Sequence, residues 1–157
     1  RPPSFRLKSI LKVMKKSFCI VCIANYCRSP VAENLLKRRF GNTYEFFSAG
    51  VSPISLPNMD PRSLKFLQEN NVNHSFHTPK KISNKMLNYF DKFLAVDFYV
   101  LNQLNVMFPK HKQKFQSLTK QFRDINILDP YQLQADEYMQ IMNDIMYVSE
   151  NINLEEA

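Results

Sequence analysis

Between residues 18 and 38 the sequence predicts a strand, a short loop and a helix in immediate succession. Phe18-Cys19-Ile20-Val21 is a short apolar run typical of a buried strand. Apolar residues at positions 31, 32, 35 and 36 then recur at helical spacing. We expect Ser29 to cap this helix and Pro30 to lie in its first turn, where its missing N–H has no partner to lose. Such a unit is typical of parallel α/β sheets.

The loop between these two elements opens with Cys22 and closes with Arg28. It lies at the N-terminus of a helix, where unpaired N–H groups and the positive end of the helix dipole attract anions. The guanidinium of Arg28 is a planar fork that can hold two phosphate oxygens at once. In these positive surroundings Cys22 is favoured as a thiolate, which is the nucleophilic form of cysteine. The loop therefore predicts a site that binds phosphate and attacks it.

The full motif, Cys-x₅-Arg-Ser-Pro at residues 22–30, contains Asn25 and Cys27 and resembles the loop of the low-molecular-weight protein tyrosine phosphatases. The resemblance covers about residues 16–147. It implies an α/β fold in which a doubly wound, four-stranded parallel sheet of flavodoxin-like topology carries helices on both faces (phosphotyrosine protein phosphatase I-like). It also implies metal-independent hydrolysis of phosphotyrosine through a cysteinyl-phosphate. No cofactor is implied, and the substrates are phosphotyrosine proteins or small aryl phosphates.

Further apolar and helical patterns extend this unit along the chain. We expect strands at residues 43–48, 93–96 and 124–128, and helices that begin at Asp60, run from Asp97 to about Met107 and occupy residues 132–153. Residues 109–121 are polar and basic, and predict an irregular or short helical connection. Ligands of parallel sheets bind beyond the carboxyl ends of the strands. The loop after residue 21 and the segment after residue 128 should therefore meet at one edge.

Asp129-Pro130-Tyr131 follows the predicted fourth strand and matches the Asp-Pro-Tyr motif of the family. Taken alone, Asp-Pro is an ordinary turn signal. The resemblance makes Asp129 the general acid that protonates the aryl leaving group, and then the base for the hydrolytic water. Tyr26 and Tyr131 match positions that line the family's substrate cleft, where aromatic walls favour a flat phosphotyrosine ring. Ordinary packing is the alternative for both tyrosines.

Backbone N–H groups of the loop are expected to hold the phosphate oxygens, and they belong to Ile23, Ala24, Asn25, Tyr26, Cys27 and Arg28. Asn25 is expected in a left-handed conformation. Ser29 is expected to donate to the thiolate besides capping the helix. The resemblance implies a supporting network of Asn25 with Ser29, Ser48 and His77.

Two residues depart from the usual pattern of the family. Ala24 stands where glycine is more common, and alanine disfavours positive φ. Tyr26 is bulkier than the usual aliphatic residue, which bears on the range of substrates.

Two other functions and one regulatory role use the same residues. A thioredoxin-coupled arsenate reductase shares the fold and the loop, but it needs downstream cysteines, and none follows Cys27 in this sequence. A phosphotyrosine-binding pseudoenzyme is the second alternative, and the presence of Cys22, Arg28 and Asp129 together argues against it. Cys27 can also form a disulfide with an oxidised Cys22; the alternative is that it packs beneath the loop.

The positive charge of the chain is concentrated at one end. The 157 residues carry a net charge of +7, and six of the 21 basic residues lie within residues 1–16, which hold no acid. The rest of the chain has 15 basic and 14 acidic residues, so no nucleic-acid partner is predicted. We interpret residues 1–13 as a basic extension outside the fold, with a targeting or membrane-surface segment as the alternative. Residues 14–157 are interpreted as a single phosphatase domain.

Hydropathy and cysteine usage predict the setting in which the protein works. No apolar stretch is long enough to span a bilayer. Three cysteines without a secretory signal predict a reducing compartment, and hence the cytoplasm. Cys19 and Cys22 match C-x-x-C, but a strand sends residues three apart to opposite faces, and no second pair or nearby histidine completes a zinc site. We therefore predict no metal site, and we expect a monomer.

Overall fold

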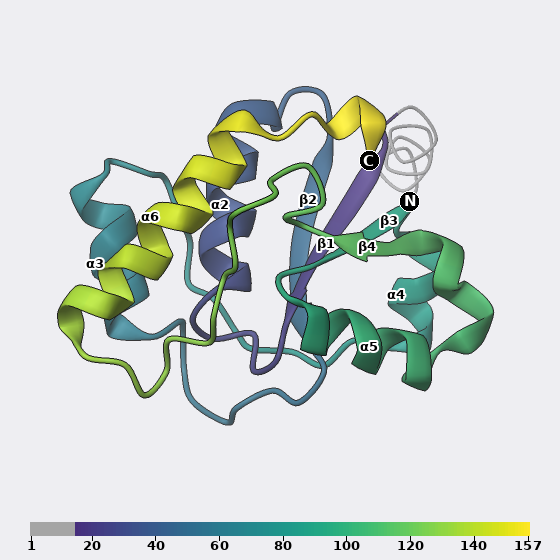
Figure 1. The fold of residues 1–157 in the computed structure, drawn as a ribbon, viewed down its shortest axis with the longest axis horizontal. Helices are drawn as coiled ribbons and strands as arrows, with labels where there is room; N and C mark the ends of the chain where they lie inside the picture. Colours follow the sequence, from purple (N-terminus) through teal and green to yellow (C-terminus); the bar gives the residue numbers. More distant parts are fainter. Residues whose placement is uncertain (1–14) are drawn as a thin grey trace, which may run out of the picture.

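Four parallel strands form the centre of the protein in the computed structural model, which describes residues 15–157 (Figure 1). They lie in the order β2-β1-β3-β4, with bounds Ser17–Cys22 for β1, Glu45–Gly50 for β2, Lys92–Ala95 for β3 and Phe115–Ser117 for β4. Cys22 pairs with Gly50, and Ala95 pairs with both Val21 and Ser117. The four strands therefore end at one edge. The strand order reverses direction beside β1, where such sheets bind their ligands.

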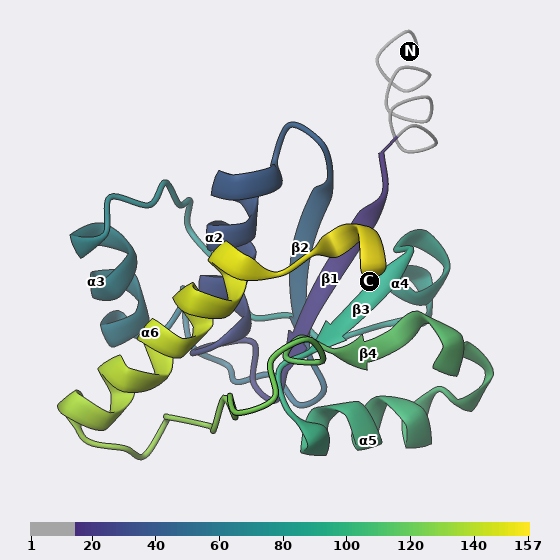
Figure 2. The same cartoon turned by 45° about the horizontal axis from the view of Figure 1, so that its top comes forward.

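Helices cover both faces of this sheet, which confirms the predicted doubly wound α/β fold (Figures 1 and 2). On one side lie α2 (Ser29–Phe40), α3 (Pro61–Glu69) and α6 (Ala135–Asn151), and on the other lie α4 (Asn84–Tyr89) and α5 (Phe98–Met107). Two 3₁₀ segments, η1 (Pro109–Lys114) and η2 (Leu154–Glu156), follow α5 and α6. Every residue of β1 is buried, because the strand is central and covered on both faces. This explains its continuous apolar sequence.

Two helix starts follow the sequence prediction and matter for the site. Asp60 caps α3, since its carboxylate accepts from the N–H of Arg62 at 2.9 Å. Asp97 caps α5 in the same way, accepting from the N–H of Val100 at 2.8 Å. Caps of this kind satisfy one of the unpaired donors of the first helical turn. Both aspartates use their second oxygen elsewhere in the site.

The prediction of a fourth strand at residues 124–128 is wrong. The fourth strand is β4, which lies inside the polar stretch expected to be irregular, and Phe115 is its one buried residue. An edge strand of three residues leaves only a weak apolar signal in the sequence. Residues 124–128 belong instead to a long connection between β4 and α6, in which Ile127 is buried and Leu128 is exposed.

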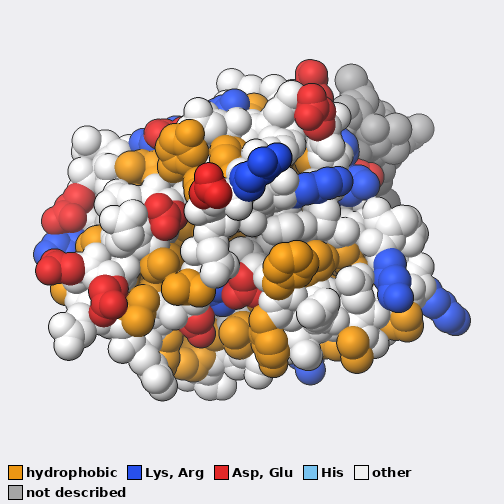
Figure 3. Space-filling view, viewed as in Figure 1, with side chains coloured by type: hydrophobic (Ala, Val, Ile, Leu, Met, Phe, Trp, Pro, Cys, Tyr) orange, Lys and Arg blue, Asp and Glu red, His pale blue; other side chains and the backbone are white. Residues whose placement is uncertain are grey.

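The surface and the chain end complete the picture. Side chains of both charges are spread over the face seen in Figure 3, so this face is not covered by a single basic field. Among residues 15–157 no helix has both the length and the apolar composition that crossing a membrane requires. The basic extension predicted at residues 1–13 lies outside the described residues.

Candidate active site

The loop from Cys22 to Cys27 is held from outside by its carbonyl groups. The first three carbonyls accept from backbone N–H groups of the segment after β2, at 3.1 Å from Val51 to Cys22, 2.8 Å from Ser52 to Ile23 and 3.3 Å from Ile54 to Ala24. The next three accept from His77 (2.7 Å to Asn25), the N–H of Asp60 (3.0 Å to Tyr26) and the hydroxyl of Ser63 (2.7 Å to Cys27). Because every carbonyl is bound from outside, the N–H groups are left for the inside of the loop.

Those N–H groups are the ones expected to hold the phosphate oxygens. The N–H of Asn25 donates to the sulfur of Cys22 at 3.2 Å. The N–H groups of Ile23, Ala24, Tyr26, Cys27 and Arg28 donate to no partner within residues 15–157. The loop leads directly into α2, whose N-terminus adds the positive end of its dipole. A phosphate seated over Cys22 would meet these donors without rearrangement of the loop.

Arg28 is a buried cation with one end fixed. Its side chain is 2% exposed, and its Nη1 donates to the carboxylate of Asp97 at 2.6 Å and to the carbonyl of Ile127 at 2.9 Å. Its Nε and Nη2 have no partner within residues 15–157. Nη1 therefore fixes the guanidinium, and the other nitrogens can hold phosphate oxygens.

Ser29 contacts the sulfur of Cys22 rather than capping the helix. The cap residue of α2 is Arg28 and makes no side-chain cap, so the prediction that Ser29 caps this helix is wrong. The Ser29 hydroxyl lies 2.9 Å from the sulfur of Cys22 and accepts from the side-chain amide of Asn25 at 2.8 Å. Either atom of the Ser29–Cys22 contact can be the donor, and the hydroxyl is the donor when the sulfur is a thiolate.

A polar network behind the loop continues from this serine, and the residues predicted for it do meet. The side-chain amide of Asn25 also donates to Ser48 at 3.0 Å, and Ser48 donates in turn to Glu33 at 2.5 Å. The Nε2 of His77 donates to the carbonyl of Asn25, because a carbonyl can only accept. Burial lowers the pKa of His77, although the bond to Asn25 opposes that shift, so the ring is neutral at pH 7. The Asn25 amide thus donates to both serines, and its bonds tie the loop to Ser48 and, through it, to Glu33.

The backbone of the loop fits its sequence without strain at Ala24. Asn25 has a φ of 55°, which confirms the predicted left-handed conformation, whereas Ala24 is not among the positive-φ residues of the described chain. The concern about alanine at this position is therefore removed. Gly50 is needed on the other side, because a Cβ there would lie 2.6 Å from the carbonyl oxygen of Ile23 and 2.9 Å from the nitrogen of Asn25.

Asp129 and the two tyrosines form the outer part of the site. Asp129 is exposed, and its carboxylate accepts from the N–H of Tyr131 at 3.2 Å. The carbonyl two residues before it, that of Ile127, is bound by Arg28. The rings of Tyr26 and Tyr131 meet edge to face with centroids 6.2 Å apart. Tyr26 is buried and Tyr131 is 45% exposed, so they form a wall between the loop and the solvent.

Cys27 lies against α3 in the structure. Its sulfur is 3.7 Å from the carboxylate of Asp60, and burial chiefly raises the pKa of its thiol to about 12. All three cysteines are unpaired. The disulfide predicted between Cys22 and Cys27 under oxidation stays a prediction.

Sequence reasoning did not identify the site roles of three residues. Glu33 ends the network, Asp97 pairs with Arg28, and Arg62 bonds to the carbonyls of the Asp129 segment. The aspartates at the two helix starts were recognisable as caps, but nothing in their spacing identifies their second partners. Within residues 15–157 no three His, Cys, Asp or Glu residues gather into a group that could hold a metal ion.

Comparison with known proteins gives relatives along nearly the whole described chain. Residues 17–154 match the family model described as "Low molecular weight phosphotyrosine protein phosphatase". The low molecular weight protein-tyrosine-phosphatase Ptp of Acinetobacter johnsonii is 31% identical over 117 residues, which is 74% of this chain and 81% of that protein. The corresponding phosphatase Wzb of Escherichia coli K12 is 26% identical over 125 residues, or 80% of this chain and 84% of Wzb.

Solved structures share the fold. The tyrosine phosphatase Wzb from Escherichia coli K30, in complex with sulphate, has a TM-score of 0.80 at 23% identity, covering 87% of this chain and 95% of Wzb. The YwlE arginine phosphatase from Geobacillus stearothermophilus has a TM-score of 0.77 at 22% identity, covering 86% of this chain and 88% of YwlE.

Proposed function

This chain belongs to the low molecular weight phosphotyrosine protein phosphatase family, and we propose that it hydrolyses phosphotyrosine, in proteins or in small aryl phosphates, through a cysteinyl-phosphate. One observation carries the proposal. The Cys22 sulfur lies in a loop whose carbonyls are all bound from outside, while the N–H groups of residues 23, 24 and 26–28 and two nitrogens of Arg28 have no partner within residues 15–157. Such a site offers a nucleophile and the donors for the three equatorial oxygens of a phosphoryl group.

In the first step the Cys22 thiolate attacks phosphorus in line with the aryl oxygen. The S–P bond forms as the P–O bond breaks, and Asp129 gives its proton to the leaving phenolate. Arg28 and the loop N–H groups balance the phosphoryl charge, so the step needs no metal ion.

In the second step water attacks the cysteinyl-phosphate. Asp129, now a carboxylate, takes the proton of the water, and the P–S bond breaks to release phosphate. The departing sulfur regains the two donors described above, the Ser29 hydroxyl at 2.9 Å and the Asn25 N–H at 3.2 Å. These bonds stabilise the leaving thiolate and so assist its departure.

The aromatic wall supports an aryl substrate. Tyr26 and Tyr131 can pack against a phenyl ring attached to the phosphate, and a flat ring gains most from such contacts. Among proteins of the same fold is one described as an arginine phosphatase. A phosphoarginine peptide is therefore the comparison substrate, and it should be turned over more slowly than the matched phosphotyrosine peptide.

A reducing compartment, such as the cytoplasm, suits this chemistry. The nucleophile must be a free thiolate, and the three cysteines are unpaired. All the proposed site residues come from one chain, which supports action as a monomer.

Substitution of the nucleophile tests the reaction. Cys22→Ser should abolish hydrolysis of p-nitrophenyl phosphate while vanadate binding, followed by calorimetry, is largely retained. Assays run with and without a chelator should agree. Substantial turnover by Cys22→Ser would refute the mechanism.

Substitution of the acid tests the role of Asp129. Asp129→Asn should lose about 10²–10⁴-fold on aryl phosphates with poor leaving groups and much less on activated ones, since only the former need the proton. Asp124→Asn, an exposed aspartate on the same connection, is the matched control and should keep wild-type rates. A uniform loss across leaving groups would show that Asp129 is not the acid.

A further inference from the structure

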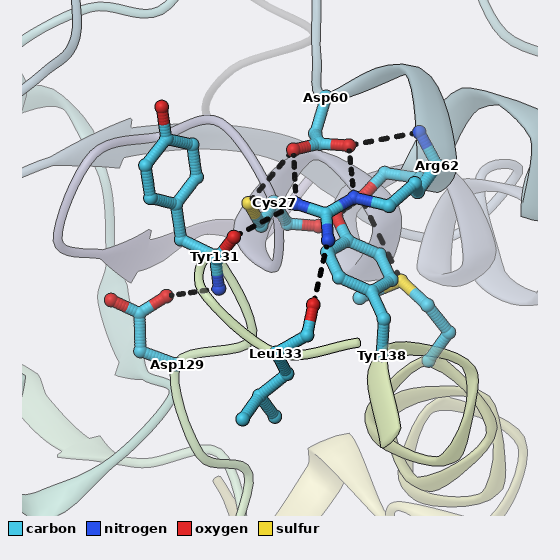
Figure 4. Close-up of polar contacts among 9 residues, drawn as sticks. Cys27, Asp60, Arg62, Asp129, Tyr131, Leu133 and Tyr138 are labelled. Atoms are coloured by element: carbon cyan, nitrogen blue, oxygen red, sulfur yellow. Dashed lines mark hydrogen bonds and ion pairs between the residues drawn. The ribbon is translucent and has the colours of Figure 1, made fainter. Parts of the chain in front are cut away.

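Arg62 forms a bridge between two parts of the site, the Cys22 loop and the segment that carries Asp129. It is the second residue of α3, and its guanidinium holds both oxygens of Asp60, with Nε 3.0 Å from Oδ1 and Nη2 2.9 Å from Oδ2. On the far side it donates to two carbonyls, from Nη2 to Tyr131 and from Nη1 to Leu133, each at 3.0 Å (Figure 4). The guanidinium also stacks on the ring of Tyr138, 3.9 Å from its centroid. Its position is thereby fixed on three sides.

The Asp60 end of the bridge is fastened to the Cys22 loop. The N–H of Asp60 donates to the carbonyl of Tyr26 at 3.0 Å, and the thiol of Cys27 donates to its Oδ2 at 3.7 Å. Burial alone would raise the pKa of Asp60, but the hydrogen bonds from Arg62 outweigh it and lower that pKa. Asp60 is therefore a charged partner for Arg62, and it moves with the loop that carries the nucleophile.

The other end of the bridge fixes the segment that carries the acid. Residues 128–134 contain no helix or strand, and Asp129 itself is exposed. Its carboxylate is oriented by the N–H of Tyr131, and the carbonyl of that same residue is bound by Arg62. On the near side, Arg28 binds the carbonyl of Ile127. Two arginines thus hold this short segment at both ends.

We propose that Arg62 is a positioning residue, which holds Asp129 at its working distance from Cys22 by tying residues 131–133 to the Cys22 loop. The inference rests on the proposed function and extends it to a residue that touches neither substrate nor nucleophile. Loss of Arg62 releases the acid segment but leaves the Cys22 loop its six bound carbonyls. The damage should therefore fall on proton transfer rather than on phosphate binding.

The test compares Arg62→Met, Arg62→Lys and the control Lys65→Met on a series of aryl phosphates. Lys65 is an exposed residue of the same helix, and among the described residues its one ion pair is with Glu69 at 3.9 Å. Arg62→Met should lose about 10–100-fold in kcat on poor leaving groups, because misplacement of a catalytic group by about 1 Å costs up to that much. It should lose under about threefold on activated ones, with an unchanged inhibition constant for phosphate. Lys65→Met should match wild type.

Arg62→Lys keeps the charge beside Asp60 but cannot hold two carbonyls in a fixed fork. It should show the same dependence on leaving group in weaker form, and it carries the test if Arg62→Met does not fold. Adding Arg62→Met to Asp129→Asn should lower the rate on poor leaving groups little further, because both changes impair the same proton transfer. An equal loss on all leaving groups, or full additivity with Asp129→Asn, would overturn the inference.

Failure of the inference can be told from failure of the proposed function. If Asp129→Asn depends on the leaving group and neither Arg62 variant does, the inference alone is wrong. If Cys22→Ser retains turnover, the proposed function is wrong whatever the Arg62 variants do.

Discussion

The ion pair between Arg28 and Asp97 leads to a prediction with two opposite parts. Removing the charge of Asp97 should lower the stability of the free enzyme but strengthen its binding of phosphate. The change is Asp97→Asn. Asparagine caps a helix as well as aspartate does, so the bond to the N–H of Val100 can be kept. What is lost is the 2.6 Å charged contact with a guanidinium that is 2% exposed. The variant therefore isolates the ion pair from the cap.

The expected loss of stability depends on the partners that Arg28 retains in this variant. Breaking a buried pair from one side costs ~3–5 kcal/mol. Here the Asp97 side chain is 16% exposed and the carbonyl of Ile127 stays in place, so we expect about 2–3 kcal/mol. In a protein of this size that lowers the Tm by about 4–12 °C. With phosphate bound, the anion itself partners Arg28, and a loss of about 1 kcal/mol should remain.

The difference between these two losses is a gain in affinity. A recovery of 1–2 kcal/mol corresponds to a phosphate inhibition constant about 5–30-fold lower than that of wild type. At the same time kcat should fall about tenfold or more, because Arg28 is no longer held in place for the equatorial phosphoryl oxygens. Asp97→Ala, which also removes the cap, should be less stable again by ~0.5–2 kcal/mol.

Thermal denaturation with and without phosphate, together with product inhibition of p-nitrophenyl phosphate hydrolysis, measures all three quantities. Asp124→Asn is the control for loss of one aspartate charge on the surface and should change none of them. Weaker phosphate binding by Asp97→Asn, with an unchanged Tm, would refute the reasoning. It would mean that the charge of Asp97 serves the ligand and not Arg28.

Other parts of the site give shorter tests. Gly50→Ala should lower kcat/KM by about tenfold or more, because its Cβ would meet the carbonyl oxygen of Ile23 at 2.6 Å and push the loop outward; wild-type kinetics would contradict this. Burial lowers the pKa of His77 below its ordinary 6.5, so the unfolded chain binds more protons and stability falls as the pH drops below 6.5. In His77→Gln the denaturant midpoint should depend less on pH between 7 and 5. If the pH dependence of the midpoint is unchanged, a group other than His77 causes it. After peroxide and then dithiothreitol, wild type should recover more activity than Cys27→Ser, since a disulfide with Cys22 protects the nucleophile from over-oxidation; equal recovery would exclude that role.

Local features of the site could be predicted from the sequence because they depend on neighbouring residues. The loop between β1 and α2, the left-handed Asn25 and the capping aspartates at 60 and 97 are all set within a few residues of chain. Ser29 is the instructive exception. Its sequence position suits a cap, but the tight loop brings its hydroxyl to the sulfur of Cys22 and the amide of Asn25 instead. Local propensity was overridden by bonds that form only when the loop closes.

Partners far apart in sequence could not be predicted in this way. Glu33 on α2 meets Ser48 on β2, and Arg62 on α3 meets carbonyls some 70 residues further on. Each contact depends on how helices pack against the sheet, and a charged residue on a helix face carries no sign of its partner. The same holds for β4, whose place at the edge depends on pairing with β3 rather than on its own three residues.

The segment wrongly predicted as a strand shows how the acid is positioned instead. The carbonyl of Ile127 accepts from Arg28, where a strand would have bonded to its neighbour in the sheet. The guanidinium that we propose to bind phosphate therefore also sets where the Asp129 segment begins. A substitution of Arg28 removes both functions together and cannot separate them. Asp97 contacts Arg28, and Arg62 contacts the segment that carries Asp129, so changes at these two positions can separate phosphate binding from proton transfer.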